Sequence, residues 1–320
     1  MNFNPARKLF VVVVLLAFPA CQKVPLPQNS KAEIPQGTAA KSKAEAYGPP
    51  KIIAKLRTTE VTEGSGVVAS GTLGVYWMHN DSGDGPYIYA VDDRGETRGV
   101  FRVVGARARD WEDIAAGPGP QPRRRYLYIG DIGNNNDKRP ELTVYRIPEP
   151  SLPGGSVALT RKKAWVTEPA EAIKLRYPDG NHDAETLLVH PVSGDLYLVT
   201  KAAFTNPIVY KAAAPLRSGD TISLVRTAEL KLPSLLGGII TGGAVSPDGR
   251  RVALCDYLQG YELVLPSSSH NFDDIWRQPI STIDLGRRSQ GEGITYRRDG
   301  KALLATSEGK GSSLIEVVRR

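Results

Sequence analysis

Four short segments of the sequence place a glutamate just ahead of a small-then-apolar run that is typical of a β-strand. The segments are TEGSG, DWED, DAETL and GEGIT, and their glutamates are Glu63, Glu112, Glu185 and Glu292. Carboxylates that recur in one local setting can converge in the fold to hold a hard cation, to share protons, or to pair with basic side chains. The next question is which fold would bring these four residues together.

The chain between and around these glutamates predicts an all-β domain. Short alternating runs rich in Val, Ile, Leu and Tyr are separated by Gly, Pro, Asp and Asn, and no long helical period occurs. The unit repeats about every 50 residues, which is the period of propeller blades. Its equivalent positions are Glu63, Glu112, Glu185, Gly242 and Glu292. The one long interval contains an insertion at 149–171 that is too short for a further blade.

The ends of this repeat predict how the ring closes. The fifth unit lacks a fourth strand, whereas KIIAKLR at 51–57 precedes the first unit and is similar to the outer strands of the others. Pairing these two ends would leave no exposed sheet edge. We therefore predict a five-bladed β-propeller over 51–320, in which the N-terminal strand completes the last blade. A six-bladed ring and a β-sandwich are the alternatives.

The first strand of each blade runs beside the central channel, so the four glutamates are expected at one mouth of that channel. Further carboxylates flank them or follow the second strands, namely Asp81, Asp113, Asp131, Asp183, Asp256 and Glu308. At about 6 Å and an effective dielectric of about 20, two such charges repel by about 3 kcal/mol. A bound cation, shared protons, or basic side chains such as Lys201 would relieve this repulsion.

A divalent cation with oxygen ligands fits this set of residues, and we predict Ca²⁺ or Mg²⁺. The predicted metal ligands are Glu63, Asp81, Glu112, Asp131, Asp183, Glu185 and Glu292. The segments NDSGDG and DIGNNND carry the alternating Asp, Asn and Gly of a calcium loop without completing an EF-hand. Zinc fits less well, because neither HExxH nor CxxC occurs. Structural ion pairing without a metal is the competing interpretation.

Two histidines adjoin the acidic positions. A histidine beside paired carboxylates could act as a general base, and we therefore predict His79, His182 and Asp113 as catalytic residues. A packed, hydrogen-bonded histidine is the competing interpretation. The sequence contains no nucleophile elbow, phosphate-binding glycine loop or cysteine-nucleophile motif.

The N-terminal segment predicts export. Arg7 and Lys8 precede the apolar run 9–18, which is too short to span a bilayer as a mature helix. Residues 1–20 are therefore expected to be a signal peptide. FPAC resembles a bacterial lipoprotein processing site, so we expect lipid on Cys21, a tether over 21–50, and an outer-membrane anchor facing the periplasm. A soluble secreted protein is the alternative.

The net charge of +7 lies mostly in the first 50 residues, so a nucleic-acid-binding face is not expected. Only two cysteines occur, Cys21 and Cys255, so no disulfide framework is expected. We expect a monomer.

The motifs HNDSGDG, DWEDIA, YIGDIGNNN, HDAETLLV and QGEGITY together resemble an exported bacterial β-propeller family of unassigned function. More loosely, the chain is similar to calcium-dependent phosphotriesterase or lactonase propellers and to esterase-like phytases. These resemblances imply a cation at the channel mouth and hydrolysis of phosphoester, ester or lactone bonds.

Three functions remain open at this point. The first is a metal-dependent hydrolase, and the second is a non-catalytic lipoprotein propeller that binds an envelope protein or a glycan. The third is a glycosidase, which needs two carboxylates on either side of a sugar-sized cleft.

Overall fold

The computed structural model describes residues 46–136, 138–152, 158–234 and 237–320. The expected signal peptide at 1–20, the lipidation site Cys21 and most of the expected tether at 21–50 lie outside these ranges. No helix within the described ranges is long and apolar enough to cross a membrane.

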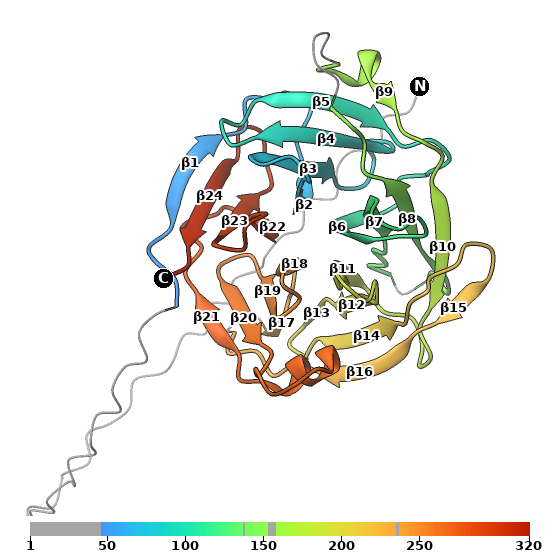
Figure 1. Cartoon of the computed structure of the whole chain (residues 1–320), viewed down its shortest axis with the longest axis vertical. Helices are drawn as coiled ribbons and strands as arrows, with labels where there is room; N and C mark the ends of the chain where they lie inside the picture. The colour runs from blue at the N-terminus through green and yellow to red at the C-terminus, as the bar shows by residue number, and fades with distance from the viewer. Residues whose placement is uncertain (1–45, 137, 153–157, 235–236) are drawn as a thin grey trace, which may run out of the picture. The chain divides into compact units, whose positions relative to one another are not determined.

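The chain from Ala46 onward is a five-bladed β-propeller (Figure 1). Blade one runs outward through β2 (Gly64–Ala69), β3 (Val75–Asn80), β4 (Tyr87–Asp92) and β5 (Thr97–Arg102). Blade two contains β6 (Trp111–Pro118), β7 (Arg125–Asp131), β8 (Leu142–Pro148) and β10 (Glu171–Arg176). Blade three contains β11 (Ala184–Val189), β12 (Leu196–Thr200), β14 (Ile208–Ala212) and β16 (Val225–Glu229). Blade four contains β18 (Gly242–Val245), β19 (Arg251–Cys255), β20 (Gly260–Val264) and β21 (Ser281–Ile283). Blade five contains β22 (Gly291–Tyr296), β23 (Ala302–Ser307), β24 (Ser313–Val318) and β1 (Lys51–Lys55).

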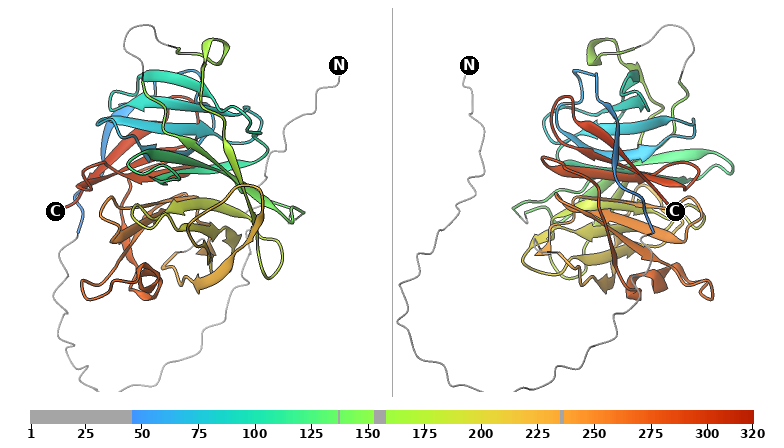
Figure 2. Two further views of the ribbon diagram at one scale, coloured as in Figure 1. Left: turned by 45° about the vertical axis from the view of Figure 1, so that its right-hand side comes forward. Right: turned by 90° about the vertical axis from the view of Figure 1, so that its left-hand side faces the viewer.

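Short elements extend two of the blades at their outer edges. β9 (Trp165–Val166) pairs in parallel with β5, and β15 (Thr221–Ser223) pairs in parallel with β10. The insertion expected at 149–171 therefore contributes a strand to blade one, together with the 3-10 helix η1 (Arg161–Lys163), which projects from that blade (Figure 2). β13 (Ala202–Ala203) pairs with β17 (Gly237–Gly238), and η2 (Phe272–Arg277) is a second 3-10 helix.

The predicted closure of the ring is confirmed, because β1 pairs antiparallel with β24 at the outside of blade five. The propeller also begins a few residues earlier than the expected boundary at residue 51. Tyr47 is buried, forms an isolated bridge with Arg319, and donates a 2.5 Å hydrogen bond from its hydroxyl to Glu262. Residues 46–50 therefore belong to the propeller and not to the tether.

The hydrophobic core is divided into five clusters, each of which lies between two neighbouring blades. Between blades one and two, for example, Trp77 and Trp111 are fully buried. The five innermost strands, here called the inner strands (β2, β6, β11, β18 and β22), also contact one another in a closed cycle. Each blade is thus stabilised mainly by its neighbours, which fixes the relative positions of the inner strands.

Closure by β1 predicts different effects for two adjacent isoleucines. Ile53 packs against the cluster between blades five and one, whereas the side chain of Ile52 faces solvent and is 58% exposed. Ile53→Ala should lower the free energy of unfolding by about 1–2 kcal/mol, because it removes partly buried methyl groups. Ile52→Ala should change it by less than about 0.5 kcal/mol. Urea unfolding of both variants is the measurement, and equal effects would contradict the closure.

Candidate metal centre

A β-bulge begins four of the five inner strands. In β6, Trp111 pairs with Asp131 and Asp113 pairs with Gly130, so that Glu112 is the extra, unpaired residue. Glu185 occupies the same place in β11. β2 and β22 carry a similar shift near Glu63 and at Glu292, whereas the register of β18 is regular. An extra residue in a bulge is released from the ladder and its side chain is re-aimed. The bulge is therefore the local feature that repeats with the glutamates.

Three carboxylates meet at the point where blades one and two adjoin. The oxygens of Asp81, Asp110 and Glu112 all lie within 4.8 Å of one another. Asp81 follows β3, Asp110 precedes β6, and Glu112 is the bulge residue of β6. Gly133 lies directly against two of them, and a Cβ atom there would collide with the oxygens of Asp110 and Glu112. Position 133 must therefore be glycine for these carboxylates to approach.

Further carboxylates surround this cluster. We call the set of Asp81, Asp110, Glu112, Asp183, Glu185 and Glu292 the acidic mouth. Burial raises the pKa of Glu112 well above its usual value, and the charges of Glu185 and Asp81 raise it further. Burial likewise raises the pKa of Asp110 to about 6, with Asp81 adding to the shift. The predicted convergence of acids from several blades is thus present, although the seven expected ligands do not all take part.

One side of the acidic mouth is neutralised by a basic residue. Lys201 forms an ion pair with Glu185, and its ammonium group lies 5.3 Å from the centre of the Tyr257 ring. Burial raises the pKa of Glu185 to about 8 even though Lys201 lowers it. Burial also raises the pKa of Glu292 to about 7, while a 2.7 Å hydrogen bond from Gln290 opposes that shift. Two of the three ways of relieving repulsion, a basic partner and a raised pKa, therefore occur at different parts of one ring.

Asp131 has a different position from the one expected for a metal ligand. It is buried, its Oδ1 atom lies 2.8 Å from a guanidinium nitrogen of Arg139, and it accepts a hydrogen bond from the backbone N–H of Asp110. Its contacts hold the backbone that presents Asp110 to the cluster. Asp131 is therefore a supporting residue of the site and not one of the three carboxylates that meet.

Two other expected ligands lie around the cluster. Glu63 is exposed, and its charge raises the pKa of Glu308 after the larger effect of burial. Asp183 accepts a 2.6 Å hydrogen bond from the backbone N–H of Asn134 and adds to the raised pKa of Glu112. Both residues contribute to the negative potential of the mouth, and neither belongs to the cluster of three carboxylates.

His79 and His182 were predicted to be catalytic, but Nδ1 of His79 and Nε2 of His182 are engaged in contacts inside the protein. His79 is fully buried, lies against the edge of Trp111, and has Nδ1 2.8 Å from the carbonyl oxygen of Asn80. Burial lowers its pKa, which favours a neutral ring. His182 has its Nε2 atom 2.9 Å from the hydroxyl of Tyr210 and 3.1 Å from Asp179. Both rings are held by packing and hydrogen bonds.

Asp113, the third residue predicted to be catalytic, connects neighbouring blades. It accepts hydrogen bonds from the backbone N–H groups of Ile114, at 2.8 Å, and of Leu187 in β11, at 2.9 Å, and the Gly243 backbone in β18 also binds it. The side chain is 1% exposed. Its contacts give it a structural part, and we leave it out of the catalytic set.

Asp110 is the site residue that the sequence interpretation missed. It lies in the same DWED segment as Glu112, two residues before it, just as Asp183 lies two residues before Glu185 in blade three. That equivalence was the available signal, because Asp183 was already among the predicted ligands.

The contacts of Asp113 predict a loss of stability when it is truncated. Asp113→Ala would leave buried N–H groups of Ile114 and Leu187 without an acceptor, and should cost about 2–4 kcal/mol. Asp220→Ala, at an exposed position, is the matched control. Denaturant unfolding measures both, and an unchanged midpoint for Asp113→Ala would contradict the structural part.

The raised pKa values predict how stability depends on pH without metal. Asp110 and Glu292 bind protons in the folded state at pH values where the unfolded chain has lost them. Their contribution to the free energy of unfolding should therefore fall by about 2 kcal/mol or more as pH rises from about 4.5 to 8, whereas buried His79, whose pKa is lowered, contributes in the opposite sense. Unfolding of the parent and of Glu292→Gln in a chelator across this range is the measurement. His79 is common to both proteins, so the parent should lose stability relative to the variant as pH rises, and an equal pH dependence in both would contradict the prediction.

Comparisons with known proteins give distant similarity to solved structures only. No family model and no curated protein matches the sequence. Among solved structures, the chain is similar to one described as "Crystal structure of Nidogen/Laminin Complex", at 13% identity and a TM-score of 0.44, over 77% of this chain and 72% of that one. The function must therefore be argued from the site.

Proposed function

We propose that the acidic mouth binds a divalent cation, Ca²⁺ or Mg²⁺, and that the protein is a metal-dependent hydrolase of phosphoester, ester or lactone bonds. The observation that carries the proposal is the meeting of Asp81, Asp110 and Glu112 within 4.8 Å. Among the residues with described positions, no lysine or arginine forms an ion pair with any of the three. Negative charge so concentrated, with oxygen ligands only, suits a hard cation.

The positions of the basic residues indicate which part of the acidic mouth would hold the metal. Lys201 neutralises Glu185 in blade three, and Arg139 neutralises Asp131 below the cluster. Three carboxylates at the junction of blades one and two remain, and Asp183 lies near enough to raise the pKa of Glu112 and Asp110. A cation at this junction would remove the repulsion that the two basic residues leave.

In a hydrolase, a bound divalent cation would polarise the scissile group and lower the pKa of a water molecule. Asp81, Asp110 and Glu112 would hold it, and Asp131 would keep Asp110 in place. Proton transfer falls to Glu292 better than to a histidine. Its pKa of about 7 lets it exist in both protonation states near neutral pH, and Gln290 fixes one of its oxygens.

The alternative is a non-catalytic lipoprotein propeller that binds an envelope protein or a glycan. The positions of the two histidines favour this function, because His79 is fully buried and the Nε2 atom of His182 is engaged with Tyr210 and Asp179. For both functions we propose the anchor that the N-terminal sequence predicts, a lipid on Cys21 that holds the protein at the periplasmic face of the outer membrane.

The metal proposal predicts a shift in melting temperature. At about 100 times the dissociation constant, a cation that binds only the folded state adds about 2.7 kcal/mol of stability, or about 5–10 °C for a domain of this size. Asp110→Asn should abolish most of this shift while leaving the metal-free protein as stable or slightly more so, because it removes one repelling charge. Asp220→Asn, an exposed position, should behave as the parent protein.

Thermal melting in chelator, in Ca²⁺ and in Mg²⁺ is the measurement. A shift that Asp110→Asn leaves intact would overturn the proposed site. Turnover of a panel of phosphoesters, esters and lactones that depends on the cation and is lost in Asp110→Asn would support the hydrolase. Cation binding without turnover would favour the binding module.

A further inference from the structure

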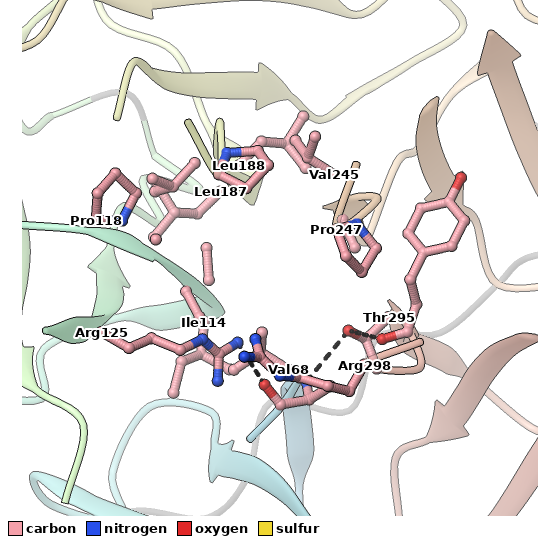
Figure 3. Close-up of a pocket in the computed structure, with 18 of the residues that line it drawn as sticks. Val68, Ile114, Pro118, Arg125, Leu187, Leu188, Val245, Pro247, Thr295 and Arg298 are labelled. Atoms are coloured by element: carbon pink, nitrogen blue, oxygen red, sulfur yellow. Dashed lines mark hydrogen bonds between the residues drawn. The ribbon is translucent and has the colours of Figure 1, made fainter. Parts of the chain in front are cut away.

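The channel also contains a cavity of about 370 Å³ that is distinct from the acidic mouth (Figure 3). All five inner strands contribute to it, through residues such as Val68, Ile114 and Leu187. In β6 the cavity residues begin at Ile114, beyond both Glu112 and Asp113, and in β22 they begin at Thr295, beyond Glu292. The cavity therefore lies farther along the inner strands than the acidic mouth, toward their C-terminal ends. We call it the distal cavity.

The wall of the distal cavity is apolar. Val68, Ile114, Leu187, Leu188 and Val245 line it. Prolines stand at or just after the ends of three inner strands, namely Pro118, Pro191 and Pro247. Proline has no backbone N–H, so these three positions present no backbone donor to the cavity. Its size lies at the lower end of the range of small-molecule sites.

The remaining part of the rim is basic. Arg123, Arg124, Arg125 and Arg298 line the distal cavity, and no aspartate or glutamate is among its described lining residues. Arg124 pairs with Glu168, outside the cavity lining. Within the described ranges, neither Arg123 nor Arg298 forms an ion pair, and both are exposed. Figure 3 shows Arg125 and Arg298 on the same side of the cavity.

The guanidinium of Arg125 is held in a fixed position. One of its nitrogens lies 2.9 Å from Glu149, and another donates a 2.6 Å hydrogen bond to the carbonyl oxygen of Ala69. Glu149 in turn accepts hydrogen bonds from Ser70, at 2.6 Å, and from the indole N–H of Trp77, at 2.7 Å. The contacts of Arg125 with Glu149 and Ala69 leave other N–H donors of its guanidinium for a ligand, and binding there would cost little side-chain entropy. Glu149 already neutralises the charge of Arg125, so the unpaired charge must come from another residue.

Arg298 adds a second positive charge close to the first. Burial lowers the pKa of Arg125, Glu149 opposes this effect, and the charge of Arg298 adds to the lowering, so the two guanidinium groups are near enough to repel. A single anion between them would be attracted by the unpaired charge of Arg298 and could accept a hydrogen bond from Arg125, and the planar fork of arginine suits a carboxylate.

We propose that the distal cavity binds a small organic carboxylate with a compact apolar body. The carboxylate lies at Arg298 and Arg125, and the apolar body lies against Val68, Ile114 and Val245. Burial of the apolar body supplies about 25 cal/mol for each Å² removed from water. This site is independent of the proposed metal site, because it shares no residue with the acidic mouth.

The test is isothermal titration calorimetry of the full chain with straight-chain and branched monocarboxylates of four to eight carbons. Alcohols of the same carbon skeletons and inorganic phosphate are the comparison ligands. We expect a carboxylate to bind at least about tenfold more tightly than its matched alcohol and than phosphate. Equal binding of alcohol and carboxylate would overturn the role of the arginines, and equal binding of phosphate would overturn the role of the apolar wall.

Substitutions in the distal cavity test whether the carboxylate binds there. Arg298→Gln should weaken carboxylate binding at least about tenfold and leave alcohol binding unchanged. Arg277→Gln is the matched control, because that side chain is 83% exposed and lies at the end of η2. Val245→Phe and Ala116→Leu each fill the cavity from a different inner strand, and either one, if folded by circular dichroism, should abolish binding. Unchanged affinity in Arg298→Gln, or in a folded cavity-filling variant, would overturn the proposal.

Discussion

The repulsion among carboxylates that are forced together at one end of the channel is the constraint on which the rest of the site depends. The inner strands are fixed by packing between blades, so the side chains at their starts cannot move apart. Glu185 is relieved by Lys201, Asp131 is relieved by Arg139, and Glu292 is relieved by holding a proton near neutral pH. Among the described residues, no lysine or arginine forms an ion pair with Asp81, Asp110 or Glu112, and burial together with the repulsion among them raises the pKa of Asp110 and of Glu112. We therefore propose this cluster as the place where a cation would bind most strongly.

The bulges explain how a regular architecture carries such an unfavourable group of charges. A regular strand would send alternate side chains into the interfaces between blades, where an unpaired carboxylate costs several kcal/mol. The extra residue interrupts that alternation at one position in each strand, at Glu112 in β6 and at Glu185 in β11. Beyond the bulge the strands resume their regular register and become apolar. One strand thus supplies both an acidic residue at its start and a hydrophobic wall farther along.

The architecture could be predicted from the sequence, because each blade is a local unit whose repeat can be recognised along the chain. The closing strand and the convergence of Glu112, Glu185 and Glu292 followed from that repeat. The roles of single polar residues could not be predicted in this way, because they depend on contacts between residues that do not repeat from blade to blade. Every residue of β3 is buried, since blades pack on both of its faces, so alternation could not reveal that His79 lies in the wall. Asp131 was predicted to be a metal ligand. Its ion-pair partner, Arg139, lies in the loop beyond β7, where the repeat of the blades could not indicate the pair.

The two regions of the channel have opposite electrostatic character, and this limits what each can bind. A phosphoester that approached the acidic mouth without a cation would be repelled by its carboxylates, and Lys201 is already paired with Glu185. A hydrolase at this mouth therefore needs the cation for substrate binding as well as for chemistry, since only the ion reverses the local potential. The distal cavity presents the reverse case, with arginines and no lining carboxylate. An anion is attracted there by residues of the chain itself, so its binding requires no metal.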